Sequence, residues 1–348
     1  MALLNVGIVG FGLAGRVFHA PLVRACPRLR LTHIVQRHGD EAHAAYPDVT
    51  VARSLDALLQ EQSVDLVVVA TPNPSHLDVA ARSLRAGKHV VVDKPFTNTS
   101  ADADQLIALA QQHKRVLSVF HNRRWDADFL TVRDILAKGL LGRLVEFESR
   151  FDRFRPEVKG TWREQAGPGS GILYDLGSHL IDQVVTLFGC PRGIFANIQQ
   201  QRDGAVADDN FELLLDYAQL KVTLKAGMLV REPAPRFVLY GTRGSFVKYE
   251  LDPQEDALAK GESARRQGWG EEPEARWGIL NTEIDGKAVR KKYPSQAGDY
   301  PAYYDNVARA IAGEGELAVK PEQARIVIRL IELAQESNQE KRVVACAF

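Results

Sequence analysis

A glycine-rich turn near the start of the chain restricts its fold more than any other feature of the sequence. The segment Gly10-Phe11-Gly12-Leu13-Ala14-Gly15 directly follows an apolar run, residues 3–9, and opens a helical pattern over residues 14–25. At this spacing the first glycine permits a tight bend, the second lets the backbone approach a pyrophosphate, and the third lets helix and strand pack closely. The amides at the start of the helix would bind the pyrophosphate. We therefore expect a dinucleotide site whose residues are Gly10, Phe11, Gly12, Leu13 and Gly15.

Up to residue 121, short β-branched runs alternate with helical periods. This alternation predicts a doubly wound parallel sheet of the Rossmann type. Pro21 lies inside the first helical pattern and should kink or split that helix, and Ser54 is placed to cap another. Strands are expected at residues 3–9, 30–35, 50–52, 64–70, 89–92 and 116–120, and helices at 14–25, 54–61, 75–86 and 100–113.

Beyond residue 121 strand follows strand, which predicts an open, mostly antiparallel sheet. Helices at 174–188, 300–312 and 321–338 would cover one of its faces, and residues 252–278 would form a long loop. The fold class is thus α/β followed by α+β. The expected domains are a dinucleotide-binding domain at 1–121 and a substrate-binding and oligomerisation domain at 122–348. Strands of the second domain are expected at 144–154, 194–201, 211–217, 220–227, 236–240, 245–250, 281–285 and 289–293.

The composition argues against several classes of protein. The 44 basic residues balance 44 acidic ones, so neither nucleic acid nor an anionic membrane is the expected partner. Cys26, Cys190 and Cys346 form no CxxC pair and no cluster of metal ligands appears, so neither a disulfide framework nor a metal site is expected. No apolar run approaches the roughly 20 residues of a membrane span. The first ten residues lack the basic start of a signal peptide, and we expect a cytoplasmic location.

The end of the second expected strand bears on the choice of cofactor. Where NAD-preferring sites have an acid bonded to the ribose 2′-hydroxyl, this chain has Gln36, followed by Arg37. Without the acid nothing repels a 2′-phosphate, and a guanidinium can bind one bidentately. The alternative for Arg37 is a solvated surface cation. The sequence therefore favours NADP, with NAD as the weaker alternative.

A second glycine-rich stretch, which begins at residue 169, introduces a candidate catalytic helix. At about 100° per residue, Asp175, His179 and Asp182 share a narrow stripe of that helix, opposite its apolar side chains. A carboxylate one turn from a histidine can orient the ring and favour its charged form, which suits proton exchange with a substrate hydroxyl. The alternative is a surface ion pair between residues four apart. The cofactor turn upstream favours catalysis.

Lys94 is a further candidate. It stands in Asp93-Lys94-Pro95, directly after the apolar run 89–92. This is the carboxyl end of an expected parallel strand, where ligands of such sheets bind. An ammonium group there could hold and polarise the reacting oxygen. An ordinary surface lysine is the alternative.

Together these motifs resemble the glucose–fructose oxidoreductase/inositol dehydrogenase (Gfo/Idh/MocA) family over essentially the whole chain. The resemblance implies an active site made of Lys94, Asp175 and His179. It also implies a homodimer or homotetramer formed through the open sheet of the second domain. The matching segments are the glycine-rich turn, Ala70-Thr71-Pro72-Asn73 with His76, Gly87-Lys88-His89-Val90 leading to Asp93-Lys94-Pro95, Trp162-Arg163, and residues 171–179.

The resemblance extends to the surroundings of the site. The family usually has Glu-Lys-Pro, and Asp93 keeps a shortened carboxylate for the cofactor ribose. The Gln36-Arg37 pair and residues 122–126 are similar to the branch that holds NADP-linked scyllo-inositol dehydrogenases. The expected cofactor contacts beyond the turn are Arg37, Thr71, Pro72, Asn73, His76, Asp93, Lys94, Asn122, Trp162 and Arg163. The expected substrate contacts are Lys94, Arg123, Asp152, Asp175 and His179, with Asp126 and Arg153 as further groups suited to a polyol.

We therefore expect a dehydrogenase that transfers a hydride between NADP and a hydroxyl or carbonyl of a cyclic polyol or sugar. His179 would take the hydroxyl proton with the help of Asp175, and Lys94 would hold the same oxygen. A reductase of non-sugar carbonyls or imines would share the cofactor turn. A non-catalytic NADP-binding regulatory protein of the same fold is the other alternative, which the presence of all three catalytic candidates disfavours.

Overall fold

The computed structural model describes residues 3–348; Met1 and Ala2, which begin the expected first domain, lie outside the described residues. The chain forms two compact units, each of which draws on three separate stretches of sequence. The sequence predicted one boundary, between residues 121 and 122, and did not predict that the two units exchange stretches of chain. A strand pattern gives no signal for the sheet against which a later helix packs. The first unit holds the chain up to Trp125, Gln254–Trp269 and Asp299–Arg325; the second holds Asp126–Pro253, Gly270–Gly298 and Ile326–Phe348.

A six-stranded sheet forms the centre of the first unit. Its strand order, β3-β2-β1-β4-β5-β6, is that of a Rossmann sheet, and all neighbouring strands pair in parallel. Strand β4 is buried at every position, as expected of a strand covered on both faces. The strands are β1 (Leu4–Val9), β2 (Leu29–Val35), β3 (Thr50–Ala52), β4 (Leu66–Val69), β5 (His89–Val92) and β6 (Leu117–Val119). The expected Rossmann fold is confirmed.

The first helical segment is not broken at Pro21, but it changes from π-helical to α-helical hydrogen bonding just before this residue. A π-helical turn, η1 (Ala14–His19), continues into α1 (Ala20–Ala25), and Pro21 lies in the first turn of α1. Ser54 caps α3 as expected, since its hydroxyl accepts a hydrogen bond of 3.1 Å from the Ala57 amide. Helix α2 (Glu41–Ala45) was not expected. The remaining helices before residue 126 are α3 (Leu55–Gln60), α4 (His76–Arg85) and α5 (Ser100–Gln112), with 3-10 turns η2 (Asn73–Ser75) and η3 (Asn122–Trp125).

Helix α9 (Pro301–Ile311) belongs to the first unit, whereas the sequence pattern predicted that it covers the second sheet. The rings of Tyr303 and Tyr304 pack against Phe120 at centroid distances of 5.0 and 5.9 Å. The Tyr303 hydroxyl also bonds the Ser118 hydroxyl of β6 at 3.1 Å. Buried aromatic rings remove a large apolar area from water, so these tyrosines fix α9 beside β6. Part of the expected 252–278 loop is also helical, as α8 (Gln254–Ala259).

The second unit is built on a nine-stranded sheet in the order β14-β13-β12-β11-β7-β10-β9-β8-β15. Strands β7 and β10 pair in parallel, and the other neighbours pair antiparallel, which confirms the open, mostly antiparallel sheet. The strands are β7 (Leu144–Arg150), β8 (Gly193–Gln199), β9 (Asn210–Tyr217), β10 (Leu220–Gly227), β11 (Phe237–Gly241), β12 (Gly244–Lys248), β13 (Gly278–Ile284), β14 (Lys287–Tyr293) and β15 (Val344–Ala345).

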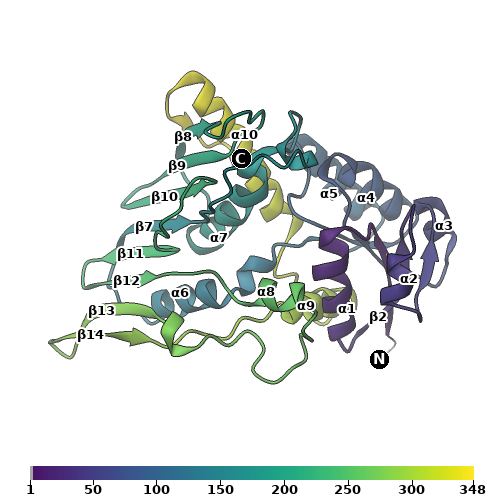
Figure 1. Cartoon of the computed structure of the whole chain (residues 1–348), viewed down its shortest axis with the longest axis horizontal. Coiled ribbons are helices and arrows are strands. Elements are labelled where there is room, and N and C mark those ends of the chain that lie inside the picture. The colour runs from purple at the N-terminus through teal and green to yellow at the C-terminus, as the bar shows by residue number, and fades with distance from the viewer. Residues whose placement is uncertain (1–2) are drawn as a thin grey trace. The chain divides into compact units, whose positions relative to one another are not determined.

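Helices cover one face of this sheet (Figure 1). The Phe188 ring of α7 lies 5.3 Å from the Phe147 ring of β7, and the Ser337 hydroxyl of α10 accepts a hydrogen bond of 3.0 Å from the Ala196 amide of β8. The helical elements are α6 (Ala127–Ala137), α7 (Ser178–Phe188) and α10 (Pro321–Glu340), with shorter turns η4 (Trp162–Glu164), η5 (Leu173–Gly177) and η6 (Glu274–Arg276). Among residues 3–348, no helix combines the length and apolar composition that crossing a membrane requires.

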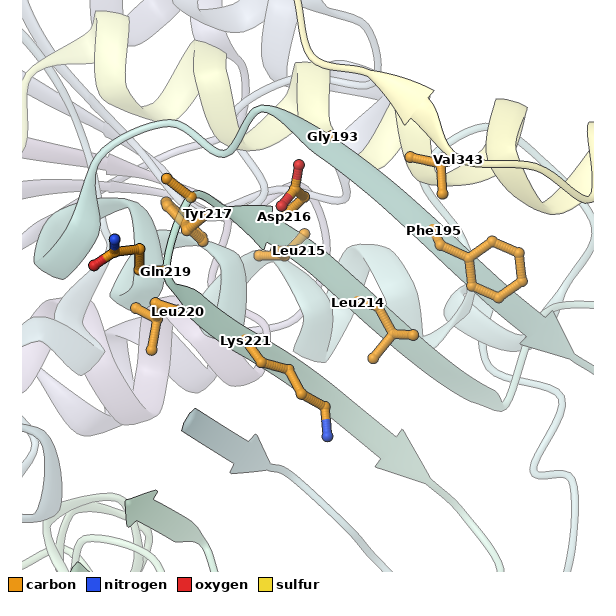
Figure 2. A pocket seen from close by; sticks show the side chains of 11 residues that line it. Gly193, Phe195, Leu214, Leu215, Asp216, Tyr217, Gln219, Leu220, Lys221 and Val343 are labelled. Carbon is orange, nitrogen blue, oxygen red and sulfur yellow. The ribbon is translucent and has the colours of Figure 1, made fainter. Parts of the chain in front are cut away.

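The other face of the sheet carries a shallow cavity of about 480 Å³ around the turn between β9 and β10. Along β9 every second residue points to this face, so Leu214 is 38% exposed while its neighbours Leu213 and Leu215 are buried. Figure 2 shows Leu214 beside Phe195 of β8 and Lys221 of β10. Apolar groups are therefore present on the face that the helices leave open.

Candidate active site

The glycine-rich turn joins β1 to η1 in the first unit, as the sequence predicts. Gly10 has φ +101°, a conformation that side chains disfavour. A Cβ added at Gly15 would overlap the Gly10 carbonyl oxygen, so turn and helix approach as closely as glycine alone allows. At Gly12 nothing lies within 4 Å of the position that a Cβ would take. Gly10 and Gly15 are thus needed for the turn, and Gly12 leaves the backbone open on one side, which fits a pyrophosphate. Leu13 is 61% exposed beside them.

The end of β2 presents a cation. Arg37 is exposed, and among the described residues it makes no hydrogen bond or ion pair. Gln36 is engaged, because its side-chain oxygen accepts a hydrogen bond of 2.8 Å from the Ala42 amide and its side-chain nitrogen bonds the Glu41 carboxylate. Arg53 holds the same segment through a hydrogen bond of 2.6 Å to the Gly39 carbonyl oxygen. The Arg37 guanidinium is therefore available to an anion.

The segment after β4 is braced by His76. Its ring is fully buried, with Nε2 2.8 Å from the Thr71 carbonyl oxygen and Nδ1 3.0 Å from the Pro95 carbonyl oxygen. Burial lowers the pKa of His76 despite the nearby Asp93 carboxylate. Asn73 is buried and Thr71 half-buried, and the Thr71 hydroxyl accepts a hydrogen bond of 2.7 Å from Ser75. His76 thus ties the segment of Thr71 and Pro72 to the segment that follows Lys94.

Asp93 faces a buried histidine of the first helix. Its carboxylate oxygen Oδ1 accepts a hydrogen bond of 2.8 Å from the Lys94 amide and lies 3.7 Å from His19 Nε2. The other His19 ring nitrogen lies 2.6 Å from the Tyr304 hydroxyl. Burial alone would raise the pKa of Asp93, but the His19 imidazole and the charges of Lys94 and His76 hold it below its usual value. His19 and Tyr304, which sequence reasoning missed, therefore fix the residue next to Lys94.

Lys94 and Asn122 follow neighbouring strands of the Rossmann sheet, β5 and β6. Lys94 is half-buried, and Asn122 is 4% exposed. Arg123, expected to bind substrate, is buried and forms an ion pair with Glu255 of α8. Glu255 lies in the stretch that was expected to be a loop, so no local pattern could have revealed this partner.

The stripe of Asp175, His179 and Asp182 lies largely buried in the second unit. His179 is 5% exposed and Asp182 is 2% exposed. Asp175 lies in the π-helical turn η5 and His179 in α7, so the regular 100° spacing does not apply between them. Asp175 keeps the partial exposure that contact with a ligand requires.

Arg163 lies beside Asp175 in the second unit. Its Nε atom is 3.4 Å from Asp175 Oδ1, and its guanidinium carbon stacks 4.6 Å above the Trp162 ring. The motif Trp162-Arg163 and the helix motif, which are separate in sequence, are therefore in contact through this ion pair. Asp152, in the same unit, has its Oδ2 atom 3.6 Å from Arg150 Nη1. Burial raises the pKa of Asp152, although Arg150 opposes the shift.

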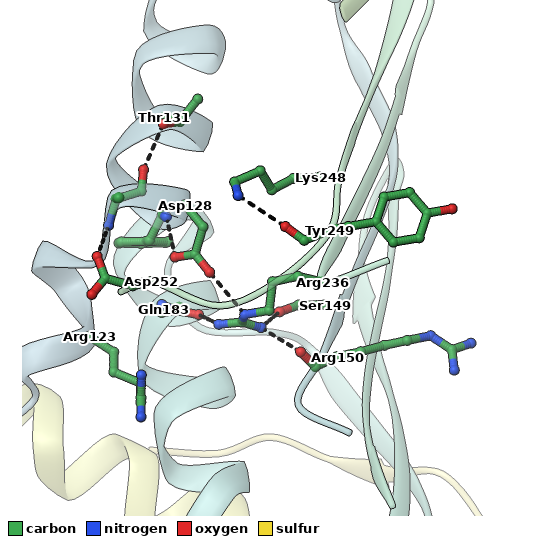
Figure 3. Close-up of polar contacts among 12 residues, drawn as sticks. Arg123, Asp128, Thr131, Ser149, Arg150, Gln183, Arg236, Lys248, Tyr249 and Asp252 are labelled. Atoms are coloured by element: carbon green, nitrogen blue, oxygen red, sulfur yellow. Dashed lines mark hydrogen bonds and ion pairs between the residues drawn. The ribbon is translucent and has the colours of Figure 1, made fainter. Parts of the chain in front are cut away.

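A buried arginine that sequence reasoning missed anchors α7 to the sheet (Figure 3). Arg236 is 3% exposed and donates hydrogen bonds to Gln183 of α7 at 2.9 Å and to the Ser149 hydroxyl of β7 at 2.6 Å. Its Nε atom lies 3.2 Å from Asp128 of α6. Hydrogen bonds from charged donors are stronger than those from neutral donors, so Arg236 firmly joins α6 and α7, the helix that carries His179, to β7.

The chain matches two known family models. The chain matches the model "Oxidoreductase family, NAD-binding Rossmann fold" over residues 4–121 and "Oxidoreductase family, C-terminal alpha/beta domain" over residues 133–346. It is 46% identical over 345 residues to the "Uncharacterized oxidoreductase YdgJ" of Escherichia coli, with 99% of each chain covered. It is 38% identical over 341 residues to "scyllo-inositol 2-dehydrogenase (NADP(+)) IolW" of Bacillus subtilis, with 98% of this chain and 95% of the relative covered.

A solved structure agrees with this assignment. The structure of yvaA from Bacillus subtilis superimposes with a TM-score of 0.96 at 38% identity, with 99% of both chains covered. The matched segments include the glycine-rich turn and the helix of Asp175 and His179. The chain therefore belongs to the Gfo/Idh/MocA family of oxidoreductases, with an NAD-binding Rossmann domain and the C-terminal α/β domain of that family.

Proposed function

We propose that the protein is an NADP-dependent dehydrogenase that transfers a hydride between the nicotinamide and a hydroxyl or carbonyl of a cyclic polyol or sugar. The observation that carries the proposal is the helix of the second unit, in which the half-buried Asp175 pairs with Arg163 and His179 follows one turn later. The relative named scyllo-inositol 2-dehydrogenase (NADP(+)) is similar over 98% of this chain, which supports an inositol-like substrate.

NADP is proposed over NAD because of Arg37. This guanidinium is exposed at the end of β2, and among the described residues no protein group pairs with it. A 2′-phosphate would supply a dianion that such a group binds bidentately. Gln36, at the position where an acid would bind the 2′-hydroxyl, is instead bonded to Glu41 and to the Ala42 amide.

Hydride transfer and proton transfer are assigned to different groups. When bound, the nicotinamide would accept or give the hydride. His179 takes the proton of the substrate hydroxyl during oxidation. Asp175 orients the His179 imidazole and stabilises its charged form. Lys94 holds the reacting oxygen as a hydrogen-bond donor. Thr71, Pro72, Asn73, Asn122, Trp162 and Arg163 are proposed to contact the cofactor, and Arg123 and Asp152 the substrate. In reduction each role is reversed.

The proposal is tested by following NADPH absorbance with a panel of inositols, sugars and non-sugar alcohols. Reduction of NADP⁺ with one or more cyclic polyols, lost in a His179→Ala variant, is the expected result. Turnover confined to non-sugar carbonyls or imines would overturn the substrate class. NADPH binding without turnover of any compound in the panel would overturn the dehydrogenase assignment.

A further inference from the structure

A buried arginine outside the proposed site connects the segment of Trp162 and Arg163 to the sheet of the second unit. The Arg202 side chain is 3% exposed, and its Nε atom donates a hydrogen bond of 3.0 Å to Asp209, whose side chain is 1% exposed. From the other end of the guanidinium, Nη1 donates to Glu164 at 2.9 Å and to the Glu157 carbonyl oxygen at 3.0 Å. One cation thus bridges two carboxylates that are far apart in sequence.

Glu164 restrains the position of its neighbour Arg163. Its second carboxylate oxygen accepts a hydrogen bond of 2.9 Å from the Lys159 amide, and its side chain and Thr161 together form a capping box at the start of η4. Arg163 directly precedes Glu164 in that turn, and its Nε atom lies 3.4 Å from Asp175 Oδ1. The segment 157–164 is therefore held at Glu164, and its position decides where Arg163 meets Asp175.

The other side of the bridge reaches the start of the candidate catalytic helix. Asp209 also accepts hydrogen bonds from the amides of Gln201 and Arg202, at 2.6 and 3.0 Å. Its neighbour Asp208 accepts one of 2.7 Å from the Leu173 amide, the first residue of η5. Two consecutive carboxylates thus hold both partners of the Arg163–Asp175 contact.

We propose that Arg202 is a positioning residue for the proposed reaction: by bridging Asp209 and Glu164 it keeps Arg163 against Asp175. The expected loss of turnover rests on the proposed function, whereas the expected release of the 157–164 segment rests on the contacts alone. Arg202 acts through Glu164 and Arg163. Removing it leaves Asp209 buried without its cation and releases the 157–164 segment. Small displacements of a positioned group cost about ten- to hundredfold in rate.

The test combines Arg202→Met, Arg202→Lys and the matched control Arg192→Met, whose side chain is 61% exposed and pairs with Asp216 at the surface. Arg202→Met is expected to lower kcat/KM about tenfold or more, Arg202→Lys to restore part of the loss, and the control to change nothing. Arg163→Ala is then combined with Arg202→Met. Because both act on the same contact, the double variant should lose little more than the worse single variant.

Trypsin supplies a readout that needs no substrate. Lys159 and Arg163 lie in the held segment, so Arg202→Met should be cleaved there at least several times faster than the wild type at equal thermal stability. If Arg202→Met does not fold, Glu164→Gln breaks the same bridge at its more exposed end, where the side chain is 17% exposed. Multiplicative kinetic losses, or unchanged cleavage of the segment, would overturn the positioning role. Absence of polyol turnover in the wild type would instead overturn the proposed function, and the cleavage rates would still decide the bridge.

Discussion

The Asp208 carboxylate accepts a hydrogen bond of 2.7 Å from the amide of Leu173, 35 positions earlier in the chain. The contact is close because Gly171 intervenes without a side chain, and a Cβ there would overlap the carboxylate. Burial raises the pKa of Asp208 to about 6, although the amides of Leu173 and Ile172 oppose the shift. The start of the candidate catalytic helix is therefore held by a group that changes charge near pH 6.

This shift predicts a pH-dependent stability. An unfolded aspartate ionises near pH 3.8, and Asp208 in the folded protein near pH 6, so the fold favours the protonated form. The contribution of Asp208 to the free energy of unfolding is complete below pH 3.8 and is lost as the pH rises through about 6. An Asp208→Asn variant has no charge to acquire, so its Tm relative to wild type should be higher at pH 7.5 than at pH 4.5. The pKa shift corresponds to at most about 3 kcal/mol.

Thermal melts at both pH values measure this difference. The variant Asn281→Ala, at an exposed residue without a titratable side chain, serves as the control and should show a constant offset. An equal offset for Asp208→Asn at the two pH values would contradict the prediction.

Cofactor preference should depend on Arg37. Removing its guanidinium deletes a charge-assisted contact to the 2′-phosphate, worth roughly 1.5–3 kcal/mol, or about ten- to hundredfold in affinity. Arg37→Ala should therefore weaken NADPH binding by that factor and leave NADH binding nearly unchanged, as measured by fluorescence titration. Arg30→Ala, an exposed arginine at the opposite end of β2, is the control. Equal losses for both cofactors, or wild-type preference for NADH, would count against the assignment.

Turnover and cofactor binding should separate in variants of the catalytic candidates. His179→Ala and Lys94→Ala remove groups assigned to the reacting oxygen, while the glycine-rich turn remains intact. A general base typically contributes about 10²–10⁴ in rate, so kcat should fall within that range with NADPH affinity retained. The His113→Ala variant, in the turn after α5, should keep wild-type kinetics. A folded His179→Ala enzyme with more than about a tenth of wild-type kcat would exclude His179 as the principal proton carrier.

We also propose that the open face of the second sheet carries a homo-oligomer contact. Leu214 is 38% exposed at the cavity that Phe195 also lines, and a strand face with apolar groups that no helix of residues 3–348 covers suits a second copy. Light scattering should give at least twice the chain mass of 38.6 kDa. Leu214→Glu should shift the protein towards the monomer, whereas Leu3→Glu, at a residue 51% exposed in the first unit, should not. A monomeric wild type at micromolar concentration would refute the proposal.

Local rules account for most of the fold that the sequence predicted. Pro21 marks the change from η1 to α1 because proline removes a helical amide, and Ser54 caps α3 because its hydroxyl replaces a missing backbone partner. Both effects act within a few residues. The position of α9 could not be predicted in this way, since it depends on Tyr303 and Tyr304 packing against Phe120, the residue after β6.

The same distinction applies to the candidate site. Asp175, His179 and Lys94 stand in motifs whose residue types suggest chemistry, and the Arg163–Asp175 contact joins two of these motifs. The residues that hold them have no motif of their own. Arg202, Asp208 and Arg236 are recognisable only through partners that other strands and helices bring to them. A periodicity of 100° per residue also fails where the helix begins as a π-turn.

The interleaving of the two units has a consequence for synthesis of the protein. Residues as late as Arg325 belong to the first unit, and α9 supplies the rings that cover Phe120 and the hydroxyl that meets His19. A nascent chain that has just completed β6 therefore exposes this apolar surface until some two hundred further residues have left the ribosome. During translation the first unit therefore remains incomplete while most of the second unit is synthesised. We expect the two units to complete their folding at nearly the same time.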